Sequence, residues 1–317
     1  MGSKSSKKKS KKELMQPDAI KTQEEILVSL TNELIVPRLK NKPGEDYEKI
    51  AELGEGSYGK VYKVRHKVTG EIRAMKQIRK KDTCTDKDDE EINNEINILK
   101  RMDHPNIMKI FEFYAAKTSY SIVNELCEHG ELFDEIINKG PFSEEKSAYI
   151  LYQILNAVNY IHKMKVIHRD LKPENVLIAG FESNTGYPFI KICDFGISKV
   201  YERGVPEKKI VGSYYYIAPE VLNGNYCEKC DVWSCGVILY ILLCQCPPFG
   251  GNDEDEIQRN VLKGKYDISS PPFTSCSNEC IALLKYLLTY NPELRPTAAQ
   301  ALEHNFFKKY QTKELFN

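Results

Sequence analysis

Apolar and polar residues alternate along the first part of the chain and recur at helical intervals along the rest. Residues 47–78 contain short alternating runs that are typical of half-buried strands, with turns expected at 54–59 and 69–70. Because side chains two positions apart share one face of a strand, Ala74 and Lys76 are expected to point in the same direction. The pattern predicts a small β-rich unit.

Helical spacing starts at residues 89–102 and dominates after Gly130. Ser143 suits the N-cap of the longest helix, because its hydroxyl can accept a hydrogen bond from a free backbone N–H group. The apolar run 236–243 is too short to span a bilayer and is interpreted as a core helix. These spacings predict an α+β fold in which a small β-rich lobe stacks on a larger helical lobe, with a cleft between them.

Both ends of the chain differ from this central part. Residues 1–23 are rich in lysine and serine and are expected to be disordered. Residues 24–36 place their apolar side chains on one helical face, and Pro37 ends that short amphipathic helix. We therefore expect a basic, largely disordered extension over residues 1–46 and a short tail over residues 308–317.

The composition is that of a soluble globular protein with one charge asymmetry. The 317 residues, of which 41% are hydrophobic and 28% are charged, can bury one large core or two lobes. The formal net charge is zero, but residues 1–12 contain six lysines and no acid, so the remaining residues carry a net charge of −6. No signal peptide is expected, because the first apolar run, at 26–28, is short and lies too far in.

The ten cysteines follow no regular spacing, which indicates free thiols in a reducing compartment. The pair Cys227 and Cys230, followed by Cys244 and Cys246, invites interpretation as a zinc site. The second pair, however, closes an apolar helix instead of forming a second zinc knuckle. A zinc site is therefore not predicted.

Five short motifs stand out, in a fixed order along the chain. They are GEGSYGKV at 54–61, AMK at 74–76, HRDLKPEN at 168–175, DFG at 194–196 and APE at 218–220. A glycine-rich string alone also arises as an ordinary turn, so the ordered set carries the specificity. Because it contains these five motifs in this order, the chain resembles the eukaryotic protein kinase family.

The resemblance implies a bilobal protein-kinase fold and an ATP-dependent kinase activity. The domain would cover residues 47–307, with the N-lobe at 47–124, the hinge at 125–130 and the C-lobe at 131–307. The residues expected to bind ATP are Leu53, Gly54, Glu55, Gly56, Ser57, Gly59, Val61, Ala74, Lys76, Glu95, Asn124, Glu125, Cys127, Glu131, Leu177 and Asp194.

The glycines of the first motif would let a hairpin cover the ATP phosphates at a distance where side chains would clash. Lys76 is expected to hold the α- and β-phosphates, with Glu95 as its ion-pair partner. Glu91 is a rival for that role, but the register before residues 103–107 favours Glu95.

The catalytic residues that the resemblance implies are Asp170, Lys172 and Asn175. Asp170 would accept the proton of the substrate hydroxyl, and Lys172 would neutralise charge on the γ-phosphate. Asn175 and Asp194 would bind Mg²⁺, because hard oxygen donors suit this hard cation. A lysine at position 172 also favours a serine/threonine kinase over a tyrosine kinase.

The alternative is a pseudokinase, a nucleotide-binding scaffold without turnover. Members of that class typically lack the lysine, the base or a metal-binding carboxylate. Lys76, Asp170, Asn175 and Asp194 are all present here, which favours the active enzyme.

Further strings narrow the resemblance to the calcium-dependent protein kinase family over residues 47–310. They are GELFDEI at 130–136, YYIAPEV at 215–221, EKCDVWS at 228–234, GVILYILL at 236–243 and PPF at 247–249. Members usually add an autoinhibitory junction and four EF-hands, and no EF-hand loop pattern occurs in this sequence. Two explanations stay open: the chain is truncated, or it is a member without its own calcium sensor.

The resemblance also implies that the protein acts in calcium signalling and that it prefers basic substrates. Glu131 resembles the family carboxylate that contacts both the ATP ribose and an arginine three residues before the target, and Glu174 can add a second acidic contact. Ile241 replaces an acid that strongly dibasic kinases carry. The expected substrate motif is Arg-x-x-Ser/Thr, with no strict need for a second arginine.

Two positions depart from the family pattern. Asn124 occupies the gatekeeper position, where its amide needs a partner such as Glu95 or a water molecule. The segment between Lys199 and Gly212 contains no Ser or Thr, so a phosphorylated Ser or Thr is not expected to order it. Glu207 could substitute for the phosphate, although the two lysines that follow it argue against this.

Four more side chains are expected to play structural parts. Glu220 should pair with Arg295, and Asp231 should anchor the backbone of the catalytic loop. Ser213 should hydrogen bond to Asp170 and Lys172 instead of acting as a switch.

The amino terminus fits the N-myristoylation pattern, with Gly2 exposed after removal of the initiator methionine and Ser6 in place. The lysines between Lys4 and Lys12 would supply the second signal that stable attachment to an anionic membrane surface requires. We therefore expect a cytoplasmic protein that is peripherally associated with a membrane. The alternatives are a cloning remnant for the Met-Gly-Ser start and a nuclear-import or nucleic-acid patch for the lysines.

Overall fold

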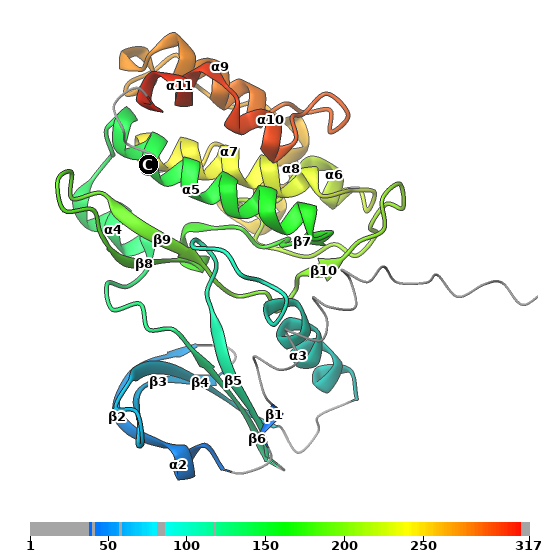
Figure 1. Ribbon diagram of the computed structural model, residues 1–317. Coiled ribbons are helices and arrows are strands. Elements are labelled where there is room, and N and C mark those ends of the chain that lie inside the picture. The colour runs from blue at the N-terminus through cyan, green and yellow to red at the C-terminus, as the bar shows by residue number, and fades with distance from the viewer. Residues whose placement is uncertain (1–37, 40–41, 57–58, 81–85, 117, 312–317) are drawn as a thin grey trace, which may run out of the picture.

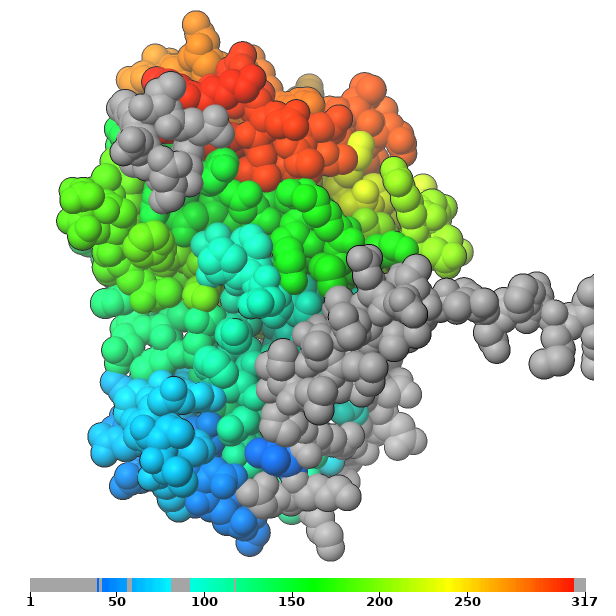
Figure 2. Space-filling view, in the orientation of Figure 1, coloured from blue at the N-terminus to red at the C-terminus, as the bar shows by residue number. Residues whose placement is uncertain are grey.

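The computed structural model describes residues 38–39, 42–56, 59–80, 86–116 and 118–311. These residues fold into a sheet-based N-lobe and a helical C-lobe (Figure 1). In the space-filling view the blue and cyan N-lobe meets the green-to-red C-lobe along one boundary (Figure 2). Within the described residues, every helix is too short or too polar to cross a membrane. The predicted α+β bilobal fold is confirmed.

The N-lobe is built on one six-stranded sheet with the order β1-β5-β6-β4-β3-β2. Its strands are β1 (Arg38–Leu39), β2 (Tyr47–Gly56), β3 (Gly59–His66), β4 (Ile72–Arg79), β5 (Ile110–Ala115) and β6 (Ser119–Asn124). All neighbours are antiparallel except β1, which pairs in parallel with the edge of β5. The short helix α2 (Pro43–Asp46) leads into β2, and α3 (Asp86–Leu99) packs beside the sheet (Figure 1).

Two sequence-based boundaries need correction. The turn expected at 54–59 is narrower, because Gly54 pairs with Val61 and Gly56 pairs with Gly59 in the β2–β3 ladder. The helix expected at 89–102 begins and ends three residues earlier, as α3. The helix predicted at 24–36 lies outside the described residues.

The two faces of the sheet are buried in different clusters. Tyr47, Val64, Met75, Tyr114 and Val123 form a small cluster on one side. The opposite face, which includes Phe113 and Ile122, joins the large core that continues through α3 into the C-lobe. The alternation expected in β4 is confirmed: Met75 is buried, while Ala74 and Lys76 lie on the other face, at the lobe boundary.

The C-lobe is mainly helical, with two small two-stranded sheets at its boundary with the N-lobe. Its elements are α4 (Leu132–Lys139), α5 (Glu144–Lys163), β7 (Val166–Ile167), η1 (Pro173–Asn175), β8 (Val176–Phe181), β9 (Pro188–Ile192), β10 (Lys199–Val200), α6 (Pro219–Leu222), α7 (Lys229–Cys244), α8 (Glu254–Lys263), η2 (Phe273–Ser275), α9 (Asn278–Leu287), α10 (Ala298–Leu302) and α11 (Asn305–Gln311). The predicted N-cap of α5 is confirmed, since the Ser143 hydroxyl accepts the Lys146 N–H at 3.2 Å.

Helix α7 is the central element of the C-lobe. It is apolar on all sides, and residues 230–243 are all buried, as the run 236–243 predicted. A Cβ atom on Gly236 would lie 2.8 Å from Leu288 Cδ2, so the glycine lets α9 and the residue after it approach closely. The catalytic loop described below is anchored on this helix.

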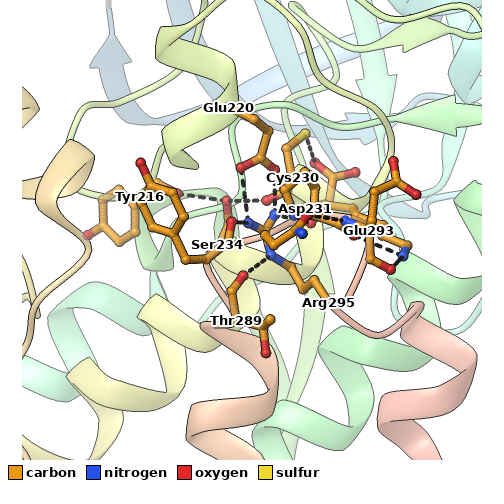
Figure 3. A network of polar contacts seen from close by, with 12 residues as sticks. Tyr216, Glu220, Cys230, Asp231, Ser234, Thr289, Glu293 and Arg295 are labelled. Carbon is orange, nitrogen blue, oxygen red and sulfur yellow. Dashed lines mark hydrogen bonds and ion pairs between the residues drawn. The ribbon is translucent and has the colours of Figure 1, made fainter.

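We call residues 194–220, from the DFG motif to the APE motif, the activation segment. A buried ion pair joins the end of this segment to the helices behind it (Figure 3). Both carboxylate oxygens of Glu220 accept hydrogen bonds from the guanidinium group of Arg295, which is 1% exposed. Arg295 also donates to the backbone carbonyls of Lys229, Thr289 and Tyr290. The predicted pairing is confirmed, and every guanidinium nitrogen has an acceptor.

Replacement of Glu220 by Gln should destabilise the protein by about 3–5 kcal/mol, because it leaves the buried Arg295 charge without its counter-ion. Equilibrium urea unfolding of the two proteins measures the difference. Glu71→Gln is the matched control, since Glu71 pairs with Arg73 on the exposed surface and its loss should leave the unfolding midpoint unchanged. Equal midpoints for Glu220→Gln and the control would contradict the role of the buried pair.

Candidate active site

The buried Asp231 near the start of α7 sets the backbone of the loop that carries Asp170. Its carboxylate accepts the backbone N–H groups of His168 and Arg169 at 2.9 Å each and bonds to His162 Nε2 at 2.8 Å. Burial alone would raise the pKa of Asp231, but the contact with His162 and the other donors hold it below its usual value. The predicted anchoring role is confirmed.

Asp170 lies at the centre of a compact polar cluster. Its Oδ1 atom accepts from the Ser213 N–H at 3.1 Å and the Ser213 hydroxyl at 2.9 Å, and its Oδ2 atom lies 2.8 Å from Lys172 Nζ. Lys172 in turn donates to the Ser213 hydroxyl at 2.9 Å. The predicted bonds of Ser213 are confirmed. Although burial raises the pKa of Asp170, the hydrogen bond from Lys172 and the other donors bring it below its usual value.

Asn175 is oriented by the same loop. Its Nδ2 group donates to the Asp170 carbonyl at 2.9 Å and to Asp170 Oδ2 at 3.1 Å. These bonds engage the amide nitrogen and leave the Oδ1 atom as the acceptor that is offered to a ligand. Cys193, directly before the DFG motif, donates its backbone N–H to the Asn175 carbonyl, which ties the two segments together.

Asp194 adopts a left-handed backbone conformation with φ of 61°. Its Oδ1 atom accepts the Gly196 N–H at 3.3 Å. Phe195 between them is fully buried and packs against the ring of His168, with 4.7 Å between centroids. A Cβ atom on Gly196 would lie 3.1 Å from Asp194 Oδ1 and 3.8 Å from Glu95 Oε2, so the glycine keeps open the space between two carboxylates.

Lys76 on β4 pairs with Glu95 on α3 at 3.9 Å, so the fold joins the residues that the motif register selected. Burial is the main cause that raises the pKa of Glu95; the charge of Lys76 opposes it and that of Asp194 adds to it. Asn94 holds α3 in place by donating to the Ser198 carbonyl at 3.0 Å. Lys76 of the N-lobe and Asp194 of the DFG motif therefore both lie close enough to Glu95 to influence its pKa.

The glycine motif forms the β2–β3 hairpin. A Cβ atom on Gly54 would meet nothing within 4 Å, so the space beside this residue is open. Gly59 has a different reason to be glycine: its φ is 133°, and a Cβ atom would lie 2.2 Å from the Gln77 carbonyl oxygen. Leu53 is 49% exposed, and Glu55 pairs with Lys60 at 3.4 Å. Ser57 lies outside the described residues.

The segment 125–130 connects the lobes. The Glu125 side chain is already engaged, because it accepts the Lys109 N–H at 2.6 Å and pairs with Lys191 at 2.9 Å. Only the backbone of Glu125 is therefore available to a nucleotide. Burial, with Glu125 as a second cause, raises the pKa of Cys127 to about 11, so this thiol is neutral.

Asn124, at the end of β6, pairs in register with Ala74. Its buried Oδ1 atom accepts no hydrogen bond from the described residues, whereas a carboxylate such as Glu95 would bond to the Nδ2 group, so the expected pairing with Glu95 stays a prediction. Leu177 on β8 forms an isolated backbone β-bridge with Glu131, so these two proposed nucleotide contacts lie side by side.

A pair of acidic residues lies next to the catalytic loop. Burial is the main cause that raises the pKa of Glu131, and the charges of Asp134 and Glu174 raise it further. The Tyr216 hydroxyl donates to Glu174 at 3.3 Å. Because the carboxylates of Glu131 and Glu174 repel each other, binding of a cation between them is favourable.

Ion pairs and hydrogen bonds hold the activation segment in place. Lys199 pairs with Glu207 at 2.7 Å, whereas Arg169 donates to the Ile197 carbonyl at 2.6 Å and the Tyr226 hydroxyl at 3.3 Å. Glu207 therefore meets a lysine and not the arginine of the HRD motif. Sequence reasoning missed Tyr226, although its position close after the APE motif was the available signal.

The donor set fits Mg²⁺. Asn175 offers an amide oxygen and Asp194 a carboxylate oxygen, both hard donors, and they project from segments joined by the bond between Cys193 and Asn175. These two residues would hold the cation, which would supply positive charge beside the nucleotide phosphates.

The fold and this constellation define a class of protein. A family model described as "Protein kinase domain" matches residues 47–307. The chain therefore belongs to the protein kinase family.

Curated relatives narrow the similarity. The chain is 45% identical over 273 residues to "Calcium-dependent protein kinase 4" of Plasmodium falciparum (isolate 3D7), an alignment that covers 86% of this chain and 51% of the relative. It is 44% identical over 259 residues to "Calcium-dependent protein kinase 29" of Arabidopsis thaliana, covering 81% and 48%. It is 43% identical over 263 residues to "Calcium-dependent protein kinase 5" of Plasmodium falciparum (isolate 3D7), covering 83% and 45%. The chain spans about half the length of these relatives.

Proposed function

We propose that this chain is a serine/threonine protein kinase that transfers the γ-phosphate of Mg-ATP to protein substrates in calcium signalling. The observation that carries the proposal is the cluster of Asp170, Lys172, Asn175 and Ser213, whose side chains are joined by hydrogen bonds and an ion pair. Residues 47–307 would be the catalytic domain, with the hinge at 125–130 between the lobes. The similarity to calcium-dependent protein kinases supports the assignment.

The geometry explains how the residues would act. Asp170 would accept the proton from a substrate hydroxyl, and its hydrogen bonds with Ser213 and Asn175 fix the direction in which the carboxylate points. Lys172, next to it, would place a positive charge where negative charge develops on the transferred group. Lys76 would hold the nucleotide phosphates from the N-lobe while Glu95 orients it.

The alternative, a nucleotide-binding scaffold, has no specific feature in its favour, because Lys76, Asp170, Asn175 and Asp194 are all present and lie in one site.

Replacement of Asp170 by Asn should lower phosphotransfer by about 10²–10⁴-fold, the usual contribution of a positioned base. ATP affinity should change little, because Asp170 is proposed to act on the hydroxyl. Transfer to a basic peptide and binding of a fluorescent ATP analogue measure the two quantities. Asp255→Asn, the same change on an exposed part of α8, is the control. Wild-type protein that binds ATP but transfers no phosphate would favour the scaffold.

We propose that the substrates carry an arginine three residues before the target, bound between Glu131 and Glu174. The raised pKa of Glu131, caused by burial and by its acidic neighbours, supports a site that gains from an incoming guanidinium group.

Wild-type protein should therefore prefer an Arg-x-x-Ser peptide to its alanine analogue by roughly 10–150-fold in kcat/KM, and Glu131→Gln should remove most of this preference. The preference should weaken as the pH falls through the raised pKa of Glu131, because only the carboxylate attracts guanidinium. The ratio between the two peptides is the readout, since an effect of Glu131 on ATP cancels in it. A ratio unchanged in Glu131→Gln and independent of pH would refute the proposed pocket.

We propose further that Gly2 is myristoylated and that the lysines at 4–12 bind anionic lipid. This segment lies outside the described residues, and the proposal rests on the motif and its neighbouring charges. One acyl chain binds marginally, and each lysine near the surface adds about 1 kcal/mol.

Gly2→Ala should release the protein from vesicles that contain phosphatidylserine, when both forms are produced together with an N-myristoyltransferase. Cosedimentation measures the bound fraction. If Gly2→Ala stays bound to the same extent, or if both forms bind nucleic acid in preference to vesicles, the lipid proposal is wrong.

A further inference from the structure

Four cysteines of the C-lobe form two close pairs. Cys244 and Cys246, on either side of Gln245 at the end of α7, have 3.3 Å between their sulfur atoms. Cys276 and Cys280 flank the start of α9, and their Sγ atoms lie within 4.8 Å of each other. Burial is the main cause that raises the pKa of Cys244 to about 12, and Cys246 and the charge of Cys276 contribute to it.

The two thiols at α9 differ in their access to solvent. Cys276 ends η2 and is partly exposed, whereas Cys280 sits in the first turn of α9 and is 0% exposed. Ser277 between them is the N-cap of α9, and its hydroxyl accepts the Cys280 N–H at 3.2 Å. The cap fixes the turn that brings the two sulfur atoms together. A reagent from solvent can therefore reach Cys276 first, while Cys280 approaches it from inside the protein.

Glu144 lies against the same two sulfur atoms, but it does not make the group a good metal site. Its carboxylate already accepts the Ser277 N–H and hydroxyl at 2.7 Å each, the Tyr310 hydroxyl at 2.9 Å and Lys309 Nζ at 3.1 Å. A metal ion would have to break these bonds before it could use the oxygen atoms. The two thiols can instead react with each other and leave Glu144 in place.

We propose that Cys276 and Cys280 form a peroxide-reactive dithiol, with Cys276 as the attacking residue and Cys280 as the resolving residue. The Cys276 thiolate attacks one oxygen of a hydroperoxide, the O–O bond breaks, and the products are a sulfenic acid on Cys276 and hydroxide or alkoxide. The Cys280 sulfur then attacks the sulfenic sulfur. Its proton and the displaced hydroxide leave as water, and an S–S bond forms. The two thiols lose two electrons, which the peroxide gains.

The acidities of the two thiols match these roles. The neighbouring Cys280 thiol lowers the pKa of Cys276, whose Sγ atom also lies 3.7 Å from the Pro272 carbonyl oxygen. The same contact is the main reason that the pKa of Cys280 is raised, with burial as the second cause. Cys276 is therefore the thiol that reaches the reactive thiolate form more readily, and it is also the one that solvent reaches.

The dithiol lies at a junction of helices remote from the N-lobe sheet (Figure 1). Ser277, between the two cysteines, bonds to Glu144 at the start of α5, and Glu144 bonds to Lys309 and Tyr310 of α11. A disulfide across residues 276–280 constrains Ser277 and so acts on the contact between α5 and α11. Because no residue of the proposed active site is involved, the oxidation can be tested separately from the proposed function.

The test uses the full chain, reduced, freed of reductant and treated with hydrogen peroxide. Free thiols are then alkylated, and the protein is cleaved at glutamate. Cleavage after Glu279 separates Cys276 from Cys280, so their two peptides stay joined only through a disulfide. We expect a joined pair that dithiothreitol separates. In Cys280→Ala the sulfenic acid should persist on Cys276 and be trapped by dimedone. The double variant Cys244→Ala and Cys246→Ala is the control and should still form the disulfide.

Two results would overturn the proposal. One is a Cys276 that stays free at peroxide concentrations that oxidise the exposed Cys246. The other is a disulfide between Cys244 and Cys246 while the α9 pair remains reduced. Thermal unfolding of untreated Cys280→Ala reports whether the variant is folded, and peptide mapping of the unaltered protein decides the question even if the variant is not.

Discussion

The catalytic geometry depends on the buried carboxylate of Asp231. Arg169 has a left-handed backbone conformation with φ of 71°, which costs an ordinary L-residue about 1–2 kcal/mol. Two hydrogen bonds from the backbone of His168 and Arg169 to Asp231 stabilise the strained turn. A carboxylate with no solvent contact is itself tolerable only when it is paired and fully hydrogen bonded, and His162 completes its partners. The loop and its anchor therefore stabilise each other.

The strained turn also determines where the activation segment returns to the site. A Cβ atom on Gly212 would lie 2.5 Å from the Arg169 carbonyl oxygen, and Gly212 has φ of 104°, so only glycine fits there. The next residue, Ser213, donates both its N–H and its hydroxyl to Asp170. Asp231 on α7 thus fixes the Arg169 backbone, which Gly212 approaches closely, and Ser213 next to Gly212 bonds to the proposed base.

Local patterns in the sequence predicted the alternation around Lys76 and the N-cap at Ser143, and both are found in the structure. The residues proposed for the site, and the pairing of Glu220 with Arg295 that the structure contains, came from the motifs and the family resemblance that they carry. The partner of Glu207 could not be derived, because Lys199 and Arg169 compete for it and only the path of the chain decides. The pair at α9 was missed for a different reason: the spacing drew attention to Cys227, Cys230, Cys244 and Cys246, whereas only the turn into α9 brings Cys276 and Cys280 together.

In the activation segment, the guanidinium group of Arg169 is bound by neutral oxygen atoms. A phosphate would satisfy the guanidinium of Arg169 with charged oxygens. Here the Tyr226 hydroxyl accepts from Arg169 at 3.3 Å and donates to the Lys209 carbonyl at 2.8 Å, while the backbones of Tyr226 and Glu207 pair with each other. Glu207 neutralises Lys199 from the same segment. Each of these partners is a side-chain or backbone group of the chain itself.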